Sequence, residues 1–306
     1  MVSRFWAVVV VAGVMASQPV LAQSNPTRDT STESTKTTAE TVANRAAALP
    51  RPNGVWLQGS YTDVEQGTPG AAFDGSLVNF VGGYDRFVTE RLLLGVALSY
   101  ESLDIDTRFL TGRGSLENSG FGITPYVGYR LDDRWSVDLA VGYNWLEYDS
   151  KVNNNTASGS FDAERWFANT SINGILRSDN WRFLPKAGLL YMKETQDAYR
   201  QTNGALVQEA DIRLGRVYAG GRIGYATETM MPYIKLIGEY DFKRPGAQAI
   251  GNGQFTSDDD TGAQIGAGVE FFSTGPYSGA VEVGYNSAFR DDLDVWNALA
   301  RIRMVF

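Results

Sequence analysis

The sequence has neither cysteine nor histidine among its 306 residues. Without these side chains the chain cannot build Ser-His-Asp or Cys-His catalysis, a zinc site of the usual ligands, or a haem site ligated by them. The lack of cysteine also excludes the disulfides on which many small secreted folds depend. No Gly-Lys dipeptide occurs, so there is no P-loop. We therefore predict a protein that is not an enzyme, with no catalytic residues, cofactor or metal.

Long apolar runs are also missing, except for one near the N-terminus. Arg4 precedes the apolar stretch Ala7–Ala16, and the small-residue site Val20–Ala22 follows it. This run is shorter than the roughly twenty apolar residues that a spanning helix needs. We predict a signal peptide at residues 1–22, with export by the general secretory pathway because no twin arginine occurs. If the remaining chain crosses a membrane, it must do so as a closed barrel.

What the sequence does contain is a regular succession of amphipathic segments from about Val55 to Phe306. Their connections alternate between short and long. The short ones are Val88–Arg91, Leu131–Arg134, Arg177–Asn180, Thr227–Met231 and Ser273–Pro276. We read Lys151–Glu164 and Pro245–Thr261 as long polar loops. This alternation predicts an all-β fold, a transmembrane up-and-down antiparallel barrel of about 12 strands over residues 54–306, in the outer membrane of a Gram-negative cell.

Each segment has two distinct faces, as the period-two geometry of a strand requires. One face of a central segment carries Trp135, Val137, Leu139, Val141, Tyr143 and Trp145. Aromatic residues near both ends of an aliphatic stripe are typical of interfacial girdles. The opposite face is rich in glycine, alanine and serine, which fits a confined lumen better than the densely polar surface of a soluble β-sandwich.

Charged residues on the second face are the candidate functional residues, because we expect them to line the lumen. They are Arg130, Asp138, Arg165, Arg182, Lys186, Arg216, Arg222, Lys235, Glu239, Glu270, Glu282, Arg301 and Arg303. Such mixed charge can line a weakly selective pore, where the basic excess would favour anions. It can equally form an ion-paired core around a plug.

The final segment places Trp296, Ile302, Met304 and Phe306 on one face, and the sequence stops at this phenylalanine. This resembles the C-terminal signature by which the assembly machinery of bacterial outer membranes recognises its barrels. The aromatic that is usual two residues before the end is replaced here by Met304.

The segments from Gly54 to Phe306 resemble the translocator β-domain of autotransporters. The motifs that carry the resemblance lie at Val55–Asp63, Gly82–Ser102, Thr124–Asp149 and Leu184–Tyr199. They include a first strand led by tryptophan and a central strand of the pattern LP-x-AGL-x-Y. The resemblance implies a twelve-stranded barrel with a helix threaded through its lumen. Only about 30 residues separate the predicted cleavage site from the barrel, too few for a folded passenger domain.

Residues 23–53 are predicted to form a polar linker that contains a short plug helix. Ser24–Lys36 is rich in serine and threonine, which is typical of a flexible segment. The alanine-rich stretch Thr37–Leu49 can form a helix ending before Pro50, with Glu40 or Arg45 pairing with lumen charges. A disordered periplasmic tail is the alternative, because short isolated helices are marginal in water.

Two function hypotheses follow from these observations. The first is a non-enzymatic barrel of the translocator type, whose N-terminal segment passes through the lumen. The alternative is a diffusion pore for small solutes or ions, or a surface adhesin acting through the long loops. Expected partners are outer-membrane lipid, lipopolysaccharide and the assembly machinery, and the chain is expected to be a monomer. The net charge of −8 argues against nucleic acid.

Two acidic clusters, Asp258–Asp260 and Asp291–Asp294, are interpreted as hydrated loop tips. Their oxygen ligands would also suit Ca²⁺ or Mg²⁺ shared with lipopolysaccharide phosphates.

Overall fold

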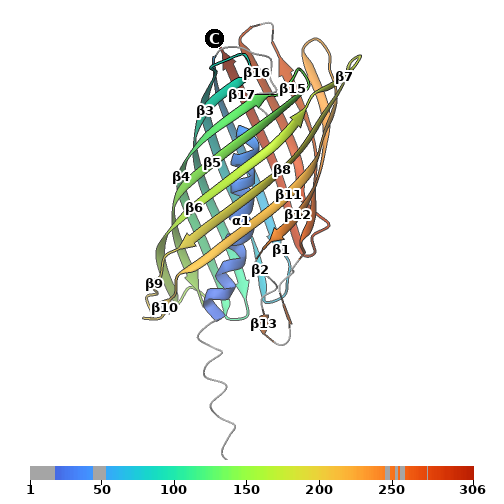
Figure 1. The fold of residues 1–306 in the computed structure, drawn as a ribbon. Coiled ribbons are helices and arrows are strands. Elements are labelled where there is room, and N and C mark those ends of the chain that lie inside the picture. The colour runs from blue at the N-terminus through green and yellow to red at the C-terminus, as the bar shows by residue number, and fades with distance from the viewer. Residues whose placement is uncertain (1–17, 44–52, 245–248, 252–253, 256–258, 274) are drawn as a thin grey trace, which may run out of the picture.

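The computed structural model describes residues 18–43, 53–244, 249–251, 254–255, 259–273 and 275–306. In this part of the chain, twelve long strands form one closed antiparallel barrel around the helix α1 (Gln18–Val42), as Figure 1 shows. The long strands are β1 (Asn53–Gln66), β2 (Ala71–Phe87), β3 (Leu92–Phe109), β4 (Gly112–Arg130), β5 (Trp135–Val152), β6 (Ala157–Gly174), β8 (Trp181–Gln196), β11 (Ala210–Tyr225), β12 (Met230–Lys243), β15 (Thr261–Phe272), β16 (Tyr277–Ala288) and β17 (Leu293–Val305). The predicted fold class is confirmed.

The barrel closes between its first and last strands. Gly54 of β1 pairs with Val305 of β17, and the antiparallel register continues to Gln66 opposite Leu293. Since β11 also pairs with β8, each long strand has a neighbour on both sides. Closure therefore leaves the wall of the barrel with no open edge, which lipid requires.

Short pieces of strand complete the fold. The strand β7 (Leu176–Ser178) continues the line of β6 and pairs with the start of β8. The hydrogen-bond ladder is interrupted between β6 and β7, opposite Pro185 of β8. Glycine fits at position 174 because a Cβ atom there would lie only 2.8 Å from the Pro185 ring. Two small hairpins, β9 (Tyr199–Arg200) with β10 (Leu206–Val207) and β13 (Ala249–Gly251) with β14 (Gln254–Phe255), extend from the end with the longer connections.

The two ends of the barrel differ as the sequence predicted. The short turns lie at the end where the C-terminus of the chain is found, at the top of Figure 1. The opposite end carries the longer hairpins, and we call it the hairpin end. By the rule for outer-membrane barrels, the short turns are periplasmic and the hairpin end is extracellular.

One predicted loop is a strand pair instead. Lys151–Glu164 was expected to be a long loop, but β5 continues to Val152 and β6 begins at Ala157. Only a tight turn remains, in which Asn153, Asn154 and Asn155 adopt left-handed conformations. Asparagine tolerates this conformation better than most residues. The prediction of a long loop was wrong because the polar residues lie on strands that extend beyond the lipid.

Polar residues occur on these strands because the strands of the β3–β5 wall exchange the polarity of their two faces along their length. On β3, Leu94, Val96 and Leu98 point outward in the half of the strand nearer the short turns, where lipid surrounds the barrel. Further along the same outward face are the exposed Asp104 and Asp106, while Ile105 between them is fully buried inside. The wall therefore changes from apolar-outside to polar-outside where it leaves the bilayer.

The helix α1 is longer than predicted and begins earlier. It starts at Gln18, inside the predicted signal peptide, and includes Ser24–Lys36, for which we predicted a flexible segment. Of the predicted helix at residues 37–49, residues 37–42 lie in α1 and residues 44–49 lie outside the described residues. None of the helices in the described ranges is both long enough and apolar enough to cross a bilayer.

The acidic clusters lie beside each other at the hairpin end. Asp258 lies outside the described residues, but the carboxylate of Asp259 accepts a hydrogen bond from the backbone nitrogen of Asp291 at 2.7 Å.

The inversion of faces makes a direct prediction for β5. Leu139→Arg places a charge against the hydrocarbon and should lower the free energy of unfolding by about 2–4 kcal/mol. Glu147→Arg, on the same outward face beyond Trp145, should change it by about 0.5 kcal/mol or less. Denaturant titration of the barrel refolded into lipid vesicles measures both. If the two variants lose equal amounts of unfolding free energy, the lipid boundary does not lie between Leu139 and Glu147.

Candidate functional site: the helix-filled lumen

The lumen of the barrel is occupied by α1, which runs along the barrel axis (Figure 1). From Thr27 to Thr38 its side chains are polar, yet all are buried. A polar helix is suited to this position because the inward face of the wall is polar as well. Buried polar atoms need hydrogen-bond partners, and the interior of the barrel supplies them.

Many of the hydroxyl groups on α1 bond to the helix itself. Thr30 donates to the carbonyl oxygen of Pro26 at 2.7 Å, and Thr32 donates to that of Arg28 at 2.8 Å. Thr41 donates in the same way to Thr37 at 2.6 Å. Threonine is a weak helix former because such local bonds compete with the helix in water. Here those bonds satisfy the side chains, so the helix needs fewer partners from the wall.

The main attachment of α1 to the wall is an ion cluster around Arg165 of β6. Its guanidinium donates to Glu194 of β8 at 2.8 Å and to Glu101 of β3 at 2.8 Å. It also donates to the hydroxyl of Ser31 on α1 at 3.0 Å, and Ser31 in turn donates to Glu194 at 2.8 Å. Tyr148 donates to the second oxygen of Glu194 at 3.2 Å. One buried arginine thus joins the helix to three strands, β3, β6 and β8.

A second cluster lies near the hairpin end. Arg216 of β11 donates to Asp241 at 2.6 Å and pairs with Glu239 at 2.7 Å. Arg290 reaches the same Asp241 carboxylate at 2.9 Å. On the helix side, Asp29 is 3.7 Å from Arg244. The first turns of the buried part of α1 therefore lie against this second cluster.

A third group of ion pairs lies in the half of the lumen with the short turns. Arg222 donates to Glu270 at 2.7 Å, and Arg301 is 3.8 Å from the same carboxylate. Lys235 is paired with Glu282. Arg303 donates to Asp85 at 2.8 Å, beside the start of β1.

The structure brings most of the predicted lumen residues into these clusters. Of the others, Asp138 accepts a hydrogen bond from Asn173 at 2.5 Å, and Lys186 lies 5.3 Å from the ring centroid of Tyr218. Arg130 is half-buried over the ring of Phe87 at 5.3 Å. Arg182 is half-buried at the short-turn rim and donates to backbone carbonyls of its own turn.

Several acidic partners that complete these clusters were not among the predicted lumen residues: Glu101, Glu194, Asp241 and Asp85. The alternation of each strand contains the signal, because Glu101 follows the outward Tyr100 and Asp241 follows the outward Tyr240. These four carboxylates offset most of the positive charge that the predicted lumen residues carry. An open lumen would therefore not strongly prefer anions.

Additional contacts hold α1 along its length. Thr35 donates to the sulfur of Met192 at 3.0 Å, and Gln264 donates to Glu40 at 3.1 Å. Asn286 donates to Glu33 at 3.1 Å. These contacts come from different strands, so the helix is attached around its circumference.

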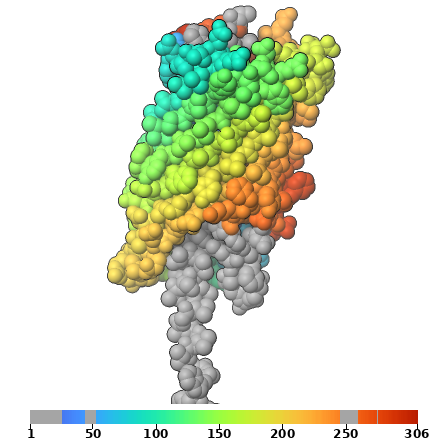
Figure 2. Space-filling view, viewed as in Figure 1, coloured from blue at the N-terminus to red at the C-terminus, as the bar shows by residue number. Residues whose placement is uncertain are grey.

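At the hairpin end, apolar packing lies beside the second ion cluster inside the barrel. The rings of Tyr148 and Phe161 stack with their centroids 5.0 Å apart. Phe161 also stacks on Tyr199 of β9, with a centroid distance of 4.7 Å. Buried residues of β2 and β3, such as Phe73 and Ile105, belong to the same cluster. The outer wall is also closely packed, with no opening through the face that Figure 2 shows.

A cavity of about 350 Å³ remains beside α1 in the half with the short turns. Lys36 and Glu40 of the helix line it, together with Lys186, Arg222 and Arg301 of the wall. The chemistry of these groups favours water and small ions. The lumen is therefore filled by a helix but not completely packed.

The geometry matches known translocator domains. The family described as "Autotransporter beta-domain" matches residues 55–286. The solved translocator domain of autotransporter NalP from Neisseria meningitidis aligns with a TM-score of 0.72 and 11% identity, over 95% of this chain and 100% of that one. At this identity, the likeness shows a shared fold.

Two curated relatives are much longer than this chain. Outer membrane protein B of Rickettsia japonica is 19% identical over 210 residues, which cover 59% of this chain and 12% of that protein. The adhesin BmaC autotransporter of Brucella suis is 27% identical over 112 residues, which cover 34% of this chain and 3% of that protein. The matched region is thus a small part of each relative.

The cluster around Arg165 predicts a large effect of one substitution. Arg165→Ala leaves Glu101 and Glu194 buried without their cation, and should cost about 3–5 kcal/mol of unfolding free energy. Arg213→Ala removes an exposed arginine paired with Asp211 and should cost about 1 kcal/mol or less. Chemical denaturation of both variants in lipid vesicles makes the comparison. Similar shifts in the two midpoints would contradict a central role for Arg165.

Proposed function

This chain belongs to the autotransporter β-domain family, and from that premise we propose that its barrel carries its N-terminal segment to the cell surface. After passage, α1 stays in the lumen and closes it. The barrel is a non-enzymatic translocator domain of the Gram-negative outer membrane, with the N-terminal helix inside.

The direction of α1 is the observation that supports this proposal. Val42, at the end of the helix, packs with Trp56 and Leu93 near the short turns. Arg28 and Asp29 lie instead beside Leu214 and Arg290 near the hairpin end. The helix therefore points its N-terminal end toward the extracellular side. A chain inserted from the periplasm reaches this arrangement only if the N-terminal part of α1 has crossed the lumen.

The partners are part of the proposal. The outward face of β17 exposes Trp296, Ile302 and Phe306, which supports recognition of this strand by the outer-membrane assembly machinery. The aromatic residues at both ends of the wall suit contact with the bilayer. We propose that the barrel acts as a monomer in lipid that includes lipopolysaccharide.

An epitope tag inserted after Gln23 tests the direction of the N-terminal segment. We expect antibody to detect this tag on intact cells, because this part of α1 lies toward the extracellular rim. Surface labelling of intact and permeabilised cells measures the accessibility.

Two tags elsewhere serve as controls. A tag in the turn at Asp132–Asp133 should be detected only after permeabilisation, and one at Asn203–Gly204 in the β9–β10 hairpin should be detected on intact cells. If the tag after Gln23 behaves like the one at Asp132–Asp133, the N-terminus is periplasmic and the proposal of translocation fails.

The cavity beside α1 favours a diffusion pore as the second candidate function. The full chain should conduct weakly, since the helix occupies most of the lumen. Deleting residues 24–42 should raise the conductance in planar bilayers, because the ion pairs of the wall then face water. A deletion variant that folds but conducts no more than the full chain would exclude the pore.

A further inference from the structure

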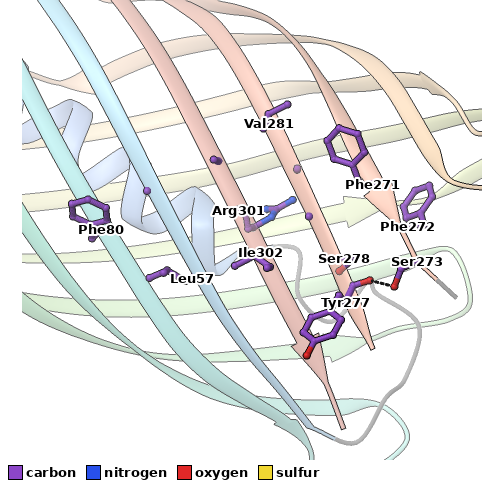
Figure 3. Close-up of a pocket in the computed structure, with 14 residues that line it drawn as sticks. Leu57, Phe80, Phe271, Phe272, Ser273, Tyr277, Ser278, Val281, Arg301 and Ile302 are labelled. Carbon is purple, nitrogen blue, oxygen red and sulfur yellow. Dashed lines mark hydrogen bonds between the residues drawn. The ribbon is translucent and has the colours of Figure 1, made fainter. Parts of the chain in front are cut away.

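The outer wall of the barrel has an apolar notch, of about 500 Å³, over the seam where β1 meets β17. Figure 3 shows its labelled side chains, with Phe80 of β2 on one side and Phe271 of β15 on the other. This volume falls within the range of about 300–1,000 Å³ that is typical of ligand pockets. The sequence analysis gave no indication of it.

The strand register explains why the notch exists. One row across the wall runs Phe80, Gly59, Ala300 and Val281. The next row runs Leu57, Ile302, Gly279 and Phe271. Both rows have large side chains at their ends and a glycine or alanine within. The notch is the space that these missing side chains leave.

The residues around the notch identify the chemistry of its occupant. Its lining is almost entirely apolar, and Phe80, Val281 and Ile302 are each about half exposed on the wall. Arg301 also lines it but is ion-paired toward Glu270 in the lumen. The notch thus offers no free charge to a polar or ionic ligand. A void against apolar walls would lose dispersion contacts, which a flexible hydrocarbon chain can restore.

The position of the notch along the barrel axis shows which leaflet of the membrane would supply this hydrocarbon chain. One end of the notch is formed by Tyr277 and Ser273, at the short turn between β15 and β16. Figure 3 shows Tyr277 at this end, where Ser273 donates to its carbonyl oxygen at 2.8 Å. The short turns are periplasmic, and phospholipid forms the periplasmic leaflet of an outer membrane. We propose that the notch binds an acyl chain of a periplasmic-leaflet phospholipid across the β1–β17 seam.

This proposal depends on the location of the barrel in the outer membrane, not on the direction of α1. It assigns a function to the small residues of the seam. Gly59 and Ala300 leave the junction of the first and last strands thin, Gly279 does the same on the neighbouring β16, and the bound chain covers this area.

The test uses the full chain in nanodiscs that contain phosphatidylethanolamine with a photoreactive diazirine on one acyl chain. After illumination, proteolysis and mass spectrometry locate the label. We expect the label to concentrate on β16 and β17, above the level on other lipid-facing strands. Even labelling around the barrel would overturn the proposal.

Matched variants separate binding from general lipid contact. Ala300→Trp fills the notch and should abolish the excess label on β16 and β17. Ala187→Trp adds the same side chain to the outward face of β8, at a similar distance from the short turns, and should leave the excess unchanged. If Ala300→Trp does not fold, Ala300→Leu provides a smaller filling side chain. Unchanged labelling in a folded Ala300 variant would overturn the proposal.

Two competing occupants give different results in the same experiment. If a diazirine on the acyl chains of lipid A labels β16 and β17 more strongly, the phospholipid assignment is wrong. If the lipid label is absent and a separate protein cross-linker joins β17 of two copies, the notch is an interface between copies and the proposal also fails.

Discussion

A lipid bilayer offers no hydrogen-bond partners to a peptide group, and the architecture of this protein depends on that constraint. Each strand must have a neighbour on both sides, so the first strand must meet the last. Closing twelve strands in this way encloses a lumen wide enough for a helix. The pairing of Gly54 with Val305 is thus the contact by which the chain satisfies its backbone without an edge.

The closed wall also explains why the interior is so rich in paired charges. Burying an isolated charge costs several kcal/mol, and a buried pair repays this only with good geometry and further hydrogen bonds. Arg165 meets these conditions, because its donors reach two carboxylates and the hydroxyl of Ser31. Such a cluster contributes specificity to the position of α1 as much as stability.

The polarity of the inward and outward faces of the wall is exchanged along the length of the barrel. In the lipid, the outward face is apolar and the lumen is polar. Beyond the lipid, the outward face carries Asp104 and Asp106, and the inward face forms the apolar cluster that contains Ile105 and Phe161. One continuous wall thus resembles a membrane protein near the short turns and a soluble β-structure near the hairpin end. An apolar cluster packs inside the barrel near the hairpin end, while the half with the short turns keeps a small polar cavity.

The sequence by itself determined the strands and their two faces, because the period of two is a local property of an extended chain. Trp135 and Leu139 point outward, and Asp138 inward, as their alternation predicts. The family resemblance and the loop rhythm likewise anticipated the barrel and its helix. These features depend on neighbours in the chain, so a single sequence carries them.

Only the tertiary structure decided which segment fills the lumen and which charges meet. Ser24–Lys36 has the composition of a flexible linker in water, but the polar wall supplies the contacts that make it helical. Glu194 finds Arg165 only when β6 and β8 are paired, and the notch over the seam exists only when β1 meets β17. These contacts join residues far apart in the sequence, and no local pattern encodes such distances.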